Sequence, residues 1–330
     1  MTTTEPMTVI VLAAETDRTA DSVITGLTER NVPVMRVDTS WFPQNMSLDA
    51  EFRDGRCSGV LRTAHHEVDL GDIRSVWVRT PSAYSFPDTM SAAERDYARR
   101  EAKIGVGGAL LALPGVLWVN RPDLAATAVY RPLQWAVAAR CGIAVPRSLV
   151  TNDPGAVQRF AAQSRTGVVV KPLTANLLYE DNTYKMGWTR KLSADDLADL
   201  RGVDATAHLV QDWVEKVWEC RAVVVGDEVF AVAIHAGSEA ARVDWRSDYP
   251  ALSYEVIDLP PGVEKALRAV MDELGLVYGA FDLSVSNDGG AEVFWFLEIN
   301  PGGQYGFLEG ATGIPITDSL VRFLARGVVG

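Results

Sequence analysis

The stretch Phe296-Leu-Glu-Ile-Asn-Pro-Gly-Gly-Gln-Tyr-Gly-Phe-Leu-Glu309 decides the fold of this chain. It begins as an apolar strand, carries acidic and amide side chains at the end of that strand, and then breaks into a glycine-rich loop. Glu298 and Asn300 are two residues apart, so on a strand they point to the same face. A carboxylate and an amide oxygen side by side are hard ligands, suited to a Mg²⁺ ion that also holds phosphate.

A second strand-like run, Ala280-Phe-Asp-Leu-Ser-Val-Ser286, lies upstream and supplies Asp282. Asn287-Asp-Gly-Gly290 joins the two runs and is a strong signal for a β-hairpin. If Asp282 joins Glu298 and Asn300, three oxygen ligands meet at one end of this hairpin. The alternative is a buried two-sided hairpin that simply has acidic residues at its ends.

The turn decides between these two interpretations. A two-residue turn at Asp288-Gly289 would pair Asp282 with Trp295, which places the Asp282 carboxylate on the face opposite Glu298. The metal site therefore requires a connection of odd length or a β-bulge, and Gly290 is the natural bulge residue.

Composition excludes several classes of protein. The chain has 330 residues, 48% hydrophobic and 22% charged, which is an ordinary balance for a globular protein of two or three domains. A formal net charge of -12 argues against nucleic-acid binding. No window of ~18 apolar residues predicts a membrane span, and the N-terminus lacks the pattern of a signal peptide. Three widely spaced cysteines fit reduced thiols, so we expect a cytoplasmic protein.

The N-terminal third predicts a parallel α/β unit. An apolar strand at 8–14, a helix to about residue 30 and a strand at 32–37 form a βαβ pattern. The turn after the first strand has no G-x-G-x-x-G, so we do not expect a dinucleotide site there. The predicted domains are residues 1–120, 121–210 and 211–330.

The middle of the chain carries three further expectations. Residues 125–141 predict one amphipathic helix. Residues 167–173 predict an edge-like strand with Lys171 near its end. Residues 177–184 and 186–192 predict a hairpin.

Several polar side chains in the predicted strands fit one task, the binding of a nucleotide. Lys171 and Arg221 can neutralise phosphates, and Glu219 can accept a hydrogen bond from a ribose hydroxyl. An apolar hinge at 212–214 can offer backbone groups to an adenine edge. Each residue also has a plain structural explanation: a solvated edge charge for Lys171, a cap or loop amide for Gln211, and an ion pair between Glu219 and Arg221.

The order of these residues resembles the ATP-grasp superfamily. The matching positions are Lys171, Gln211, Asp212, Trp213, Val214, Glu219, Arg221, Asp282, Glu298 and Asn300. More narrowly, the stretch 296–309 resembles the signature of graspetide synthetases, the microviridin-type ligases, with the actinobacterial branch as the nearest type. Ser75-Val-Trp-Val-Arg-Thr-Pro81 resembles their pre-ATP-grasp domain. The resemblance implies an α/β (α+β ATP-grasp) fold, in which an N-terminal parallel α/β pre-ATP-grasp domain precedes a two-lobed ATP-grasp fold.

The resemblance also implies a function. ATP phosphorylates an Asp or Glu side chain of a ribosomal precursor peptide, and a Thr or Ser hydroxyl or a Lys amine of that peptide attacks the acyl phosphate. The implied cofactors are ATP and Mg²⁺, the implied partner is the leader and core of the precursor, and a homodimer is the usual assembly. Lys171, Arg221 and Mg²⁺ would neutralise the approaching anions. Arg242 or Arg246 would orient the acceptor carboxylate, although Arg also serves commonly in surface ion pairs.

Two features depart from the family pattern. Arg131 stands where the superfamily usually has a second Lys, and we expect it to contact phosphate with a different geometry. No glycine-rich phosphate loop follows Lys171. The hairpin stands there instead, and Glu180, Asp181 and Asn182 are candidates for a leader-peptide contact or form a solvated acidic turn.

Two other functions fit the same nucleotide residues. One is an ATP-grasp ligase that joins free amino acids or modifies a protein terminus. The other is a nucleotide-binding regulator without turnover, which the Arg at position 131 leaves open.

Overall fold

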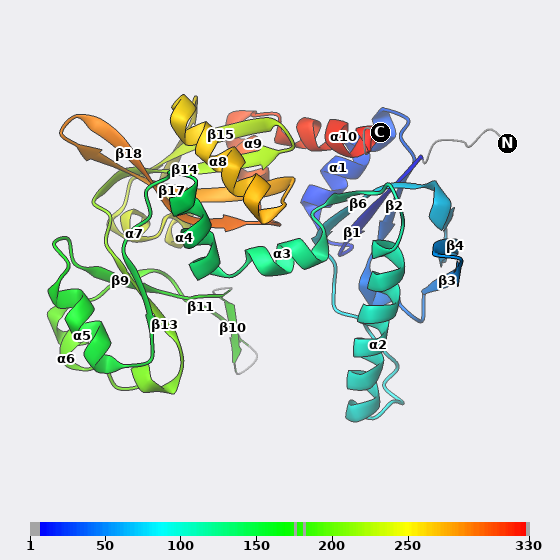
Figure 1. Cartoon of the computed structure of the whole chain (residues 1–330), viewed down its shortest axis with the longest axis horizontal. Coiled ribbons are helices and arrows are strands. Elements are labelled where there is room, and N and C mark those ends of the chain that lie inside the picture. The colour runs from blue at the N-terminus through cyan, green and yellow to red at the C-terminus, as the bar shows by residue number, and fades with distance from the viewer. Residues whose placement is uncertain (1–6, 175–176, 181–182, 328–330) are drawn as a thin grey trace.

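The computed structural model describes residues 7–174, 177–180 and 183–327. Figure 1 shows a parallel sheet at the N-terminal end of the molecule, a five-stranded antiparallel sheet at the other end and a four-stranded antiparallel sheet below that one. The mixed α/β architecture predicted from the sequence is confirmed. Within the described ranges, no helix combines the length and the apolar composition that crossing a bilayer requires.

The N-terminal sheet is parallel and has the strand order β2-β1-β6-β7. Its elements are β1 (Thr8–Ala13), α1 (Arg18–Glu29), β2 (Val34–Val37), β6 (Ile73–Thr80), α2 (Ala92–Leu111) and β7 (Leu117–Val119). Parallel neighbours need crossover connections, and α1 and α2 supply two of them, as the βαβ pattern predicts. Ser91 and Glu94 form a capping box that starts α2. A separate antiparallel sheet inserted before β6 contains β3 (Met46–Arg53), β4 (Arg56–Thr63) and β5 (Glu67–Asp69).

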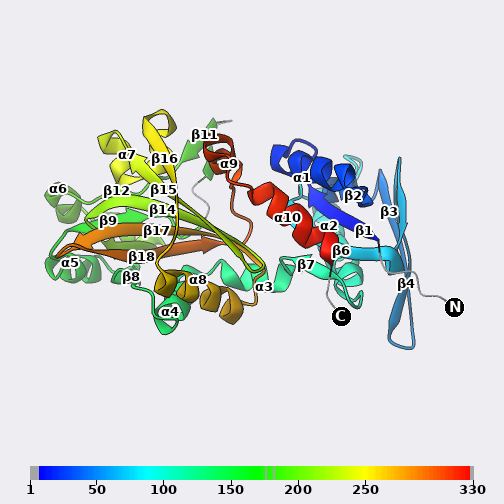
Figure 2. The same cartoon turned by 90° about the horizontal axis from the view of Figure 1, so that it is seen from above.

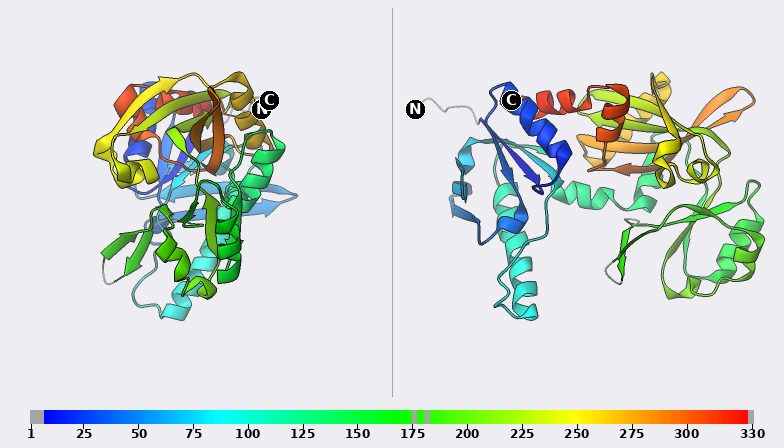
Figure 3. Two further views of the ribbon diagram at one scale, coloured as in Figure 1. Left: turned by 90° about the vertical axis from the view of Figure 1, so that its left-hand side faces the viewer. Right: turned by 180° about the vertical axis from the view of Figure 1, so that it is seen from behind.

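The four-stranded sheet has the order β12-β9-β13-β8. Its elements are β8 (Ser148–Thr151), α5 (Pro154–Ala162), β9 (Val168–Lys171), β12 (Arg190–Lys191), α6 (Ala194–Ala198) and β13 (His208–Asp212). Figure 3 shows this lobe lying below the five-stranded sheet. The prediction that β9 is an edge strand is wrong, because β12 and β13 pair with its two sides. Burial of Val168 and Val169 follows from that interior position.

The predicted hairpin over 177–192 is only partly correct. A two-stranded sheet joins β10 (Leu177–Glu180) to β11 (Thr183–Met186), so the hairpin closes within a shorter segment. The segment that follows supplies β12, which pairs with β9 instead.

The five-stranded sheet has the order β16-β15-β14-β17-β18 and leaves β18 at one edge. Its strands are β14 (Lys216–Val225), β15 (Glu228–Ala236), β16 (Leu252–Ile257), β17 (Tyr278–Asp288) and β18 (Ala291–Asn300), with α7 (Glu239–Val243) after β15. One face of the sheet packs with α4 (Arg131–Arg140) and α8 (Pro261–Leu274) into a continuous apolar core. Part of the opposite face, including Val223 and Val225, packs into a second apolar core with β1, and the rest carries polar side chains such as Arg221 and Asp282.

The single helix predicted over 125–141 is wrong. The chain forms α3 (Pro122–Ala128) and α4 (Arg131–Arg140) instead. Pro132 lacks an N–H group and disfavours the helical conformation of the residue before it, so a helix cannot run through this point without strain. Proline is tolerated in the first turn, where its missing donor has no partner to lose. The break places Arg131 at the first position of a new helix.

The β17–β18 hairpin contains the bulge that the sequence required, but at another place. Asp288 pairs with Ala291, so the turn residues are Gly289 and Gly290, with φ of 59° and 94°. Both angles belong to a primed two-residue turn, which leaves Gly290 no part in a bulge. The register slips further along, where the pairs Leu283–Phe296 and Asp282–Glu298 leave Leu297 as the extra residue.

The bulge changes which residues of β18 face the core on either side of Leu297. Phe294 and Phe296 lie in the apolar core before it, and Ile299 lies in the same core after it. The core positions therefore change from even to odd numbers at Leu297. Glu298 consequently faces away from the core, as the metal-site prediction demands.

The C-terminal helices return to the N-terminal sheet. The chain continues from β18 into α9 (Gly306–Thr312) and α10 (Ile316–Arg326). Leu320 and Leu324 of α10 pack with Val9 and Leu27 in one core, and Ser75 Oγ donates to the carbonyl of Leu324 (3.0 Å). Figure 2 shows α10 beside α1, between the two ends of the molecule.

One buried side chain also joins the two ends. Asn120 follows β7 and is 3% exposed. Its Nδ2 donates to the carbonyls of Tyr278 (2.7 Å) and Pro301 (2.8 Å), and its Oδ1 accepts from the N–H groups of Val277 (2.8 Å) and Tyr278 (3.0 Å). A single amide thus ties the N-terminal sheet to β17 and to the glycine-rich loop.

Replacing Asn120 by alanine is expected to lower the free energy of unfolding by on the order of 3 kcal/mol, because several buried backbone groups lose their partner at once. The midpoint of chemical unfolding measures this loss. The exposed Asn45→Ala serves as the control for the same substitution and should leave the midpoint unchanged. Equal midpoints for the two variants would contradict the role given to Asn120.

Candidate active site

A cavity of about 360 Å³ lies between the four-stranded and the five-stranded sheets. Every catalytic, nucleotide-binding or metal-binding residue predicted from the sequence lines this cavity, except Arg221 and Arg242. The residues come from β9, β13, β14, β17 and β18, from the start of α4 and from the segment after α7. Side chains that are more than a hundred positions apart in the sequence therefore meet in one place.

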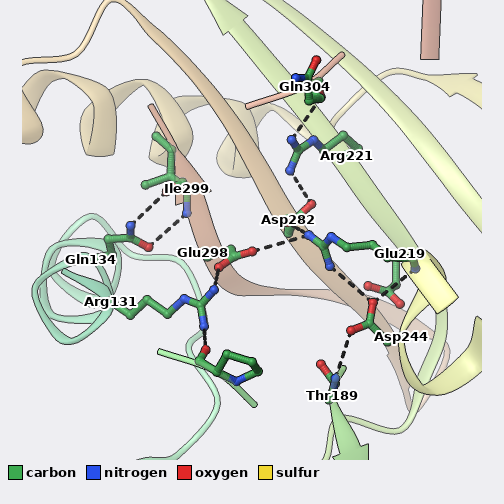
Figure 4. Close-up of polar contacts among 12 residues, drawn as sticks. Arg131, Gln134, Thr189, Glu219, Arg221, Asp244, Asp282, Glu298, Ile299 and Gln304 are labelled. Carbon is green, nitrogen blue, oxygen red and sulfur yellow. Dashed lines mark hydrogen bonds and ion pairs between the residues drawn. The ribbon is translucent and has the colours of Figure 1, made fainter. Parts of the chain in front are cut away.

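A row of three charged residues crosses the sheet at this cavity. Arg221 on β14 pairs with Asp282 on β17, which pairs with Glu298 on β18. Directly opposed residues share a face, so all three side chains point the same way. Arg221 Nη1 donates to Asp282 Oδ1 (2.7 Å), and Nη2 donates to the carbonyl of Gln304 in the glycine-rich loop (3.1 Å; Figure 4).

A second arginine, Arg246, contacts both carboxylates of this row. Its Nη2 forms ion pairs with Asp282 Oδ2 and with Glu298 Oε1, the latter at 3.4 Å. Asp244 accepts from the Arg246 N–H (3.2 Å) and from the Thr189 N–H (3.1 Å), which joins this segment to the loop before β12. Arg246 is thus held against the two carboxylates by Asp244.

The surrounding charges keep Asp282 ionised. Burial alone would raise the pKa of Asp282, but the guanidinium groups of Arg221 and Arg246 overcome this effect and lower it to about 2. Burial raises the pKa of Glu219, although the ammonium of Lys216 opposes that change. Asp282 is therefore an anion at neutral pH and a suitable ligand for a cation.

Two cations line the wall nearest the four-stranded sheet. Arg131 forms an ion pair with Glu298 Oε2 and donates to the carbonyl of Pro172. Burial lowers the pKa of Lys171 from 10.5 to about 8, and the positive charges of Arg131 and Lys216 add to the effect while Glu298 opposes it. Arg131 and Lys171 thus line the same cavity, and the contact of each with phosphate stays a prediction.

The donor set fits a divalent cation that prefers oxygen. Asp282, Glu298 and Asn300 lie on the cavity face of two paired strands and supply two carboxylates and one amide oxygen. In the part of the chain that the structure describes, no three His, Cys, Asp or Glu side chains form a metal-binding group. The predicted set reaches three donors only because it includes Asn300.

The hinge at 212–214 is mostly engaged within the protein. Trp213 donates its N–H to the carbonyl of Gly167 (2.9 Å), and its own carbonyl accepts from Thr166 Oγ1 (2.5 Å). The Asp212 carboxylate pairs with Arg147. Within the described residues the N–H of Val214 has no hydrogen-bond partner, so Val214 is the hinge residue best suited to meet an adenine edge.

Two other predicted nucleotide contacts have protein partners. Gln211 lies in β13 and donates from Nε2 to Ser148 Oγ (2.8 Å). Glu219 pairs with Lys216, not with Arg221, so the predicted structural ion pair between Glu219 and Arg221 is wrong. Glu219 and Arg221 share a face of β14. Arg221 nevertheless forms its ion pair with Asp282, which lies directly opposite it on β17.

Some candidates lie elsewhere or outside the described residues. Arg242 is exposed on α7 and does not line the cavity, so its role as an acceptor-orienting residue stays a prediction. Asp181 and Asn182 lie outside the described residues, as does the side chain of Glu180. The leader-peptide contact expected of these three residues therefore also stays a prediction.

Sequence reasoning missed two residues of this site. Asp244 stands between the two predicted arginines, in the stretch Arg242-Val-Asp-Trp-Arg246, but its hydrogen-bond partners could not be predicted from spacing. Gly303 stands in the glycine-rich loop, where an added Cβ would lie 2.5 Å from Ala280 Cβ, 2.7 Å from Arg221 Nη2 and 3.1 Å from Asn300 Cβ. The loop needs glycine here because no side chain fits against the charged row.

Comparison with known proteins identifies the fold. Residues 8–125 match the family model of the MvdD pre-ATP grasp domain. The structure is similar to macrocyclase MdnC bound with precursor peptide MdnA from Microcystis aeruginosa MRC, with 26% identity, a TM-score of 0.84 and coverage of 97% of this chain and 99% of that one. The Chryseobacterium gregarium RiPP-associated ATP-grasp ligase, in complex with ADP and a leader and core peptide, matches with 26% identity, a TM-score of 0.87 and 97% coverage of each chain.

The chain carries a pre-ATP-grasp domain of the MvdD type and shares the fold of RiPP ATP-grasp ligases over nearly its whole length. A third similar structure is the ATP-grasp ligase PsnB complexed with minimal precursor, Mg and ADP, with 26% identity, a TM-score of 0.77 and coverage of 99% of this chain and 98% of that one. A search of the curated proteins found no match. The resemblance read from the C-terminal signature of the chain is therefore confirmed, whereas its actinobacterial assignment stays a prediction.

Two neighbouring glycines test the packing of the site. In Gly303→Ala the new methyl group must displace Arg221 or Asn300, and a misplacement of this size is expected to lower kcat about hundredfold. Gly302→Ala is the matched control, because its Cβ would meet only the Arg79 carbonyl at 3.8 Å, an ordinary contact. Steady-state ADP release measures both, and similar rates for the two variants would contradict the assignment.

The pKa of Lys171 predicts a pH dependence of ATP binding. The ammonium loses its proton as the pH rises through about 8, so ATP affinity is expected to fall above that pH. Because the triphosphate favours the charged form, binding in this range should take up protons. Calorimetry in buffers of different ionisation enthalpy measures the uptake. Lys171→Arg keeps its charge and should remove the dependence; a dependence unchanged in this variant would assign it to another group.

Proposed function

We propose that this protein uses ATP and Mg²⁺ to phosphorylate Asp or Glu side chains of a ribosomal precursor peptide and joins them to Thr or Ser hydroxyls or Lys amines of the same peptide. The products are macrocyclic ω-esters or ω-amides, ADP and phosphate. The observation that carries the proposal is the cation-lined row of Asp282 and Glu298 at the cavity, within a fold shared over nearly its whole length with a macrocyclase bound to its precursor.

The chemistry requires a cavity rich in positive charge. A carboxylate becomes a good electrophile only after one oxygen is turned into a phosphate leaving group, and the carboxylate and the triphosphate repel each other as they approach. Lys171 and Arg131 line the side on which a nucleotide held by the hinge would place its phosphates. Arg246 contacts Glu298 Oε1 whereas Arg131 contacts Glu298 Oε2, and Arg246 has the planar donor fork that binds a carboxylate, so we assign the acceptor side chain to it.

Asp282, Glu298 and Asn300 are the residues that would hold Mg²⁺. When bound, the ion neutralises phosphate oxygens and orients the transferred group. In the structure Arg131 and Arg246 are paired with these carboxylates. With Mg²⁺ sharing the negative charge of Asp282 and Glu298, Arg131 would be able to contact the phosphate and Arg246 the substrate carboxylate.

The proposed partner and setting follow from the relatives and from the cysteines. The similar structures hold precursor, leader and core peptides, and one of them holds Mg and ADP. We therefore propose a leader-bearing precursor peptide as the partner and, as is usual in the family, a homodimer as the assembly. Cys57, Cys141 and Cys220 are free thiols, which suits the reducing cytoplasm where ATP is supplied.

Substitution of the acidic ligands tests the reaction. Asp282→Asn and Glu298→Gln are expected to abolish crosslinking of the precursor encoded beside the synthetase gene, because the amides cannot replace the charge that holds Mg²⁺. Mass spectrometry measures the reaction as the loss of one water per crosslink. Glu292→Gln on the exposed part of the same strand is the control and should retain activity.

Three outcomes would contradict the proposal. Near-normal turnover by either acidic-ligand variant would refute the metal assignment. Addition of a free amino acid, without loss of water inside the peptide, would indicate the amino-acid ligase. Release of ADP without any peptide product would indicate the nucleotide-binding regulator.

A further inference from the structure

Helix α4 touches β18 on both sides of Glu298. Arg131, Gln134 and Trp135 stand at positions i, i+3 and i+4, so they share one face of the helix. Arg131 pairs with the Glu298 carboxylate itself. The other two side chains contact the backbone of the residues before and after it, although neither belongs to the charged row.

Gln134 makes the backbone hydrogen bonds that a neighbouring strand would otherwise make at the open edge of β18. Its Oε1 accepts from the N–H of Ile299 (3.1 Å), and its Nε2 donates to the carbonyl of Ile299 (2.9 Å; Figure 4) and to that of Ala128 (2.6 Å). The side chain is 2% exposed, so these bonds are made away from water. Trp135 Nε1 donates to the carbonyl of Leu297 (3.1 Å).

These contacts fall where β18 needs them most. β18 is the edge of its sheet, and the bulge at Leu297 interrupts its ladder with β17. Buried backbone groups at such a point must find partners outside the sheet. The N–H of Phe296 donates to the carbonyl of Ala144 (2.8 Å), and Gln134 and Trp135 bind the backbone of Ile299 and Leu297. The position of the extra residue is thus fixed from the helix side.

A shift of the extra residue would damage the site without unfolding the sheet. If the bulge moved two positions toward the C-terminus, to Ile299, the residues between its old and new positions would exchange faces. Glu298 would then turn to the core face, and Ile299 would lose its place in the core. Fixing the bulge therefore fixes which residues face Asp282.

We propose that Gln134 and Trp135 are positioning residues that hold the bulge at Leu297 and thereby keep Glu298 directed at the metal beside Asp282. The inference rests on the proposed function, in which Glu298 is a metal ligand. Neither residue needs to contact the nucleotide or the peptide. Their effect is exerted through the backbone on either side of the ligand.

Metal affinity is the measurement that separates positioning from general stability. Gln134→Leu removes both bonds to Ile299, and Trp135→Phe removes only the donor to Leu297 with little loss of volume. In the full-length protein with ADP, Mn²⁺ titrated by electron paramagnetic resonance is expected to bind about tenfold more weakly to Gln134→Leu, with a smaller loss for Trp135→Phe. ADP affinity without metal should stay at the wild-type value for both.

The matched control lies on the same helix. Val137 is buried in the apolar core, and its side chain cannot form a hydrogen bond with the backbone of Leu297 or Ile299. Val137→Ala should lower the thermal midpoint of unfolding while Mn²⁺ affinity stays unchanged. Wild-type Mn²⁺ affinity in both Gln134→Leu and Trp135→Phe would overturn the inference, as would an equal loss of affinity in Val137→Ala.

Failure of the metal site itself gives a different result. If the wild-type ADP complex bound no Mn²⁺, or if Glu298→Gln bound it as tightly as the wild type, the metal assignment of the proposed function would be wrong and this inference would fall with it. Weak Mn²⁺ binding in Glu298→Gln together with intact binding in the Gln134 and Trp135 variants would overturn the positioning role alone.

Discussion

A β-strand shows alternate side chains to opposite faces, so one extra residue exchanges the faces of everything beyond it. In β18 that residue is Leu297, and it allows Phe296 and Ile299 to enter one core while Glu298 faces the cavity. Without it, the sheet could satisfy its core or its charged row, but not both. The cavity, the donor set and the contacts of α4 all depend on this one change of register.

The charged row also explains why the site draws on distant segments. Burying Asp282 beside Glu298 places two anions together in a region of low dielectric, which is costly unless cations accompany them. Arg221 comes from the same sheet, Arg246 from the segment after α7, and Arg131 from the start of α4. Arg246 and Arg131 each hold a further segment of the chain against the sheet. The same ion pairs therefore neutralise the buried carboxylates and fix the surrounding segments in place.

Local pattern predicted much of this arrangement, and tertiary contacts decided the rest. The strands, their hairpin and the shared face of Glu298 and Asn300 follow from spacing alone. The need for a bulge also followed, but not its position, because Gln134 and Trp135 bind that backbone from a helix far away in the sequence. Arg242 and Arg246 looked equivalent in one motif. Only Arg246 enters the cavity, because Asp244 binds its backbone and side chain.

The last helix of the chain has a consequence for the order in which the molecule is completed. α10 supplies Leu320 and Leu324 to the core of the sheet that contains β1. Backbone carbonyls of α10 accept hydrogen bonds from the side chains of Ser75 and Arg74. During synthesis on the ribosome, the N-terminal sheet therefore keeps part of its apolar surface uncovered until α10 has left the exit tunnel. The core of the N-terminal sheet is thus completed only after the strands of the four-stranded and five-stranded sheets have been synthesised.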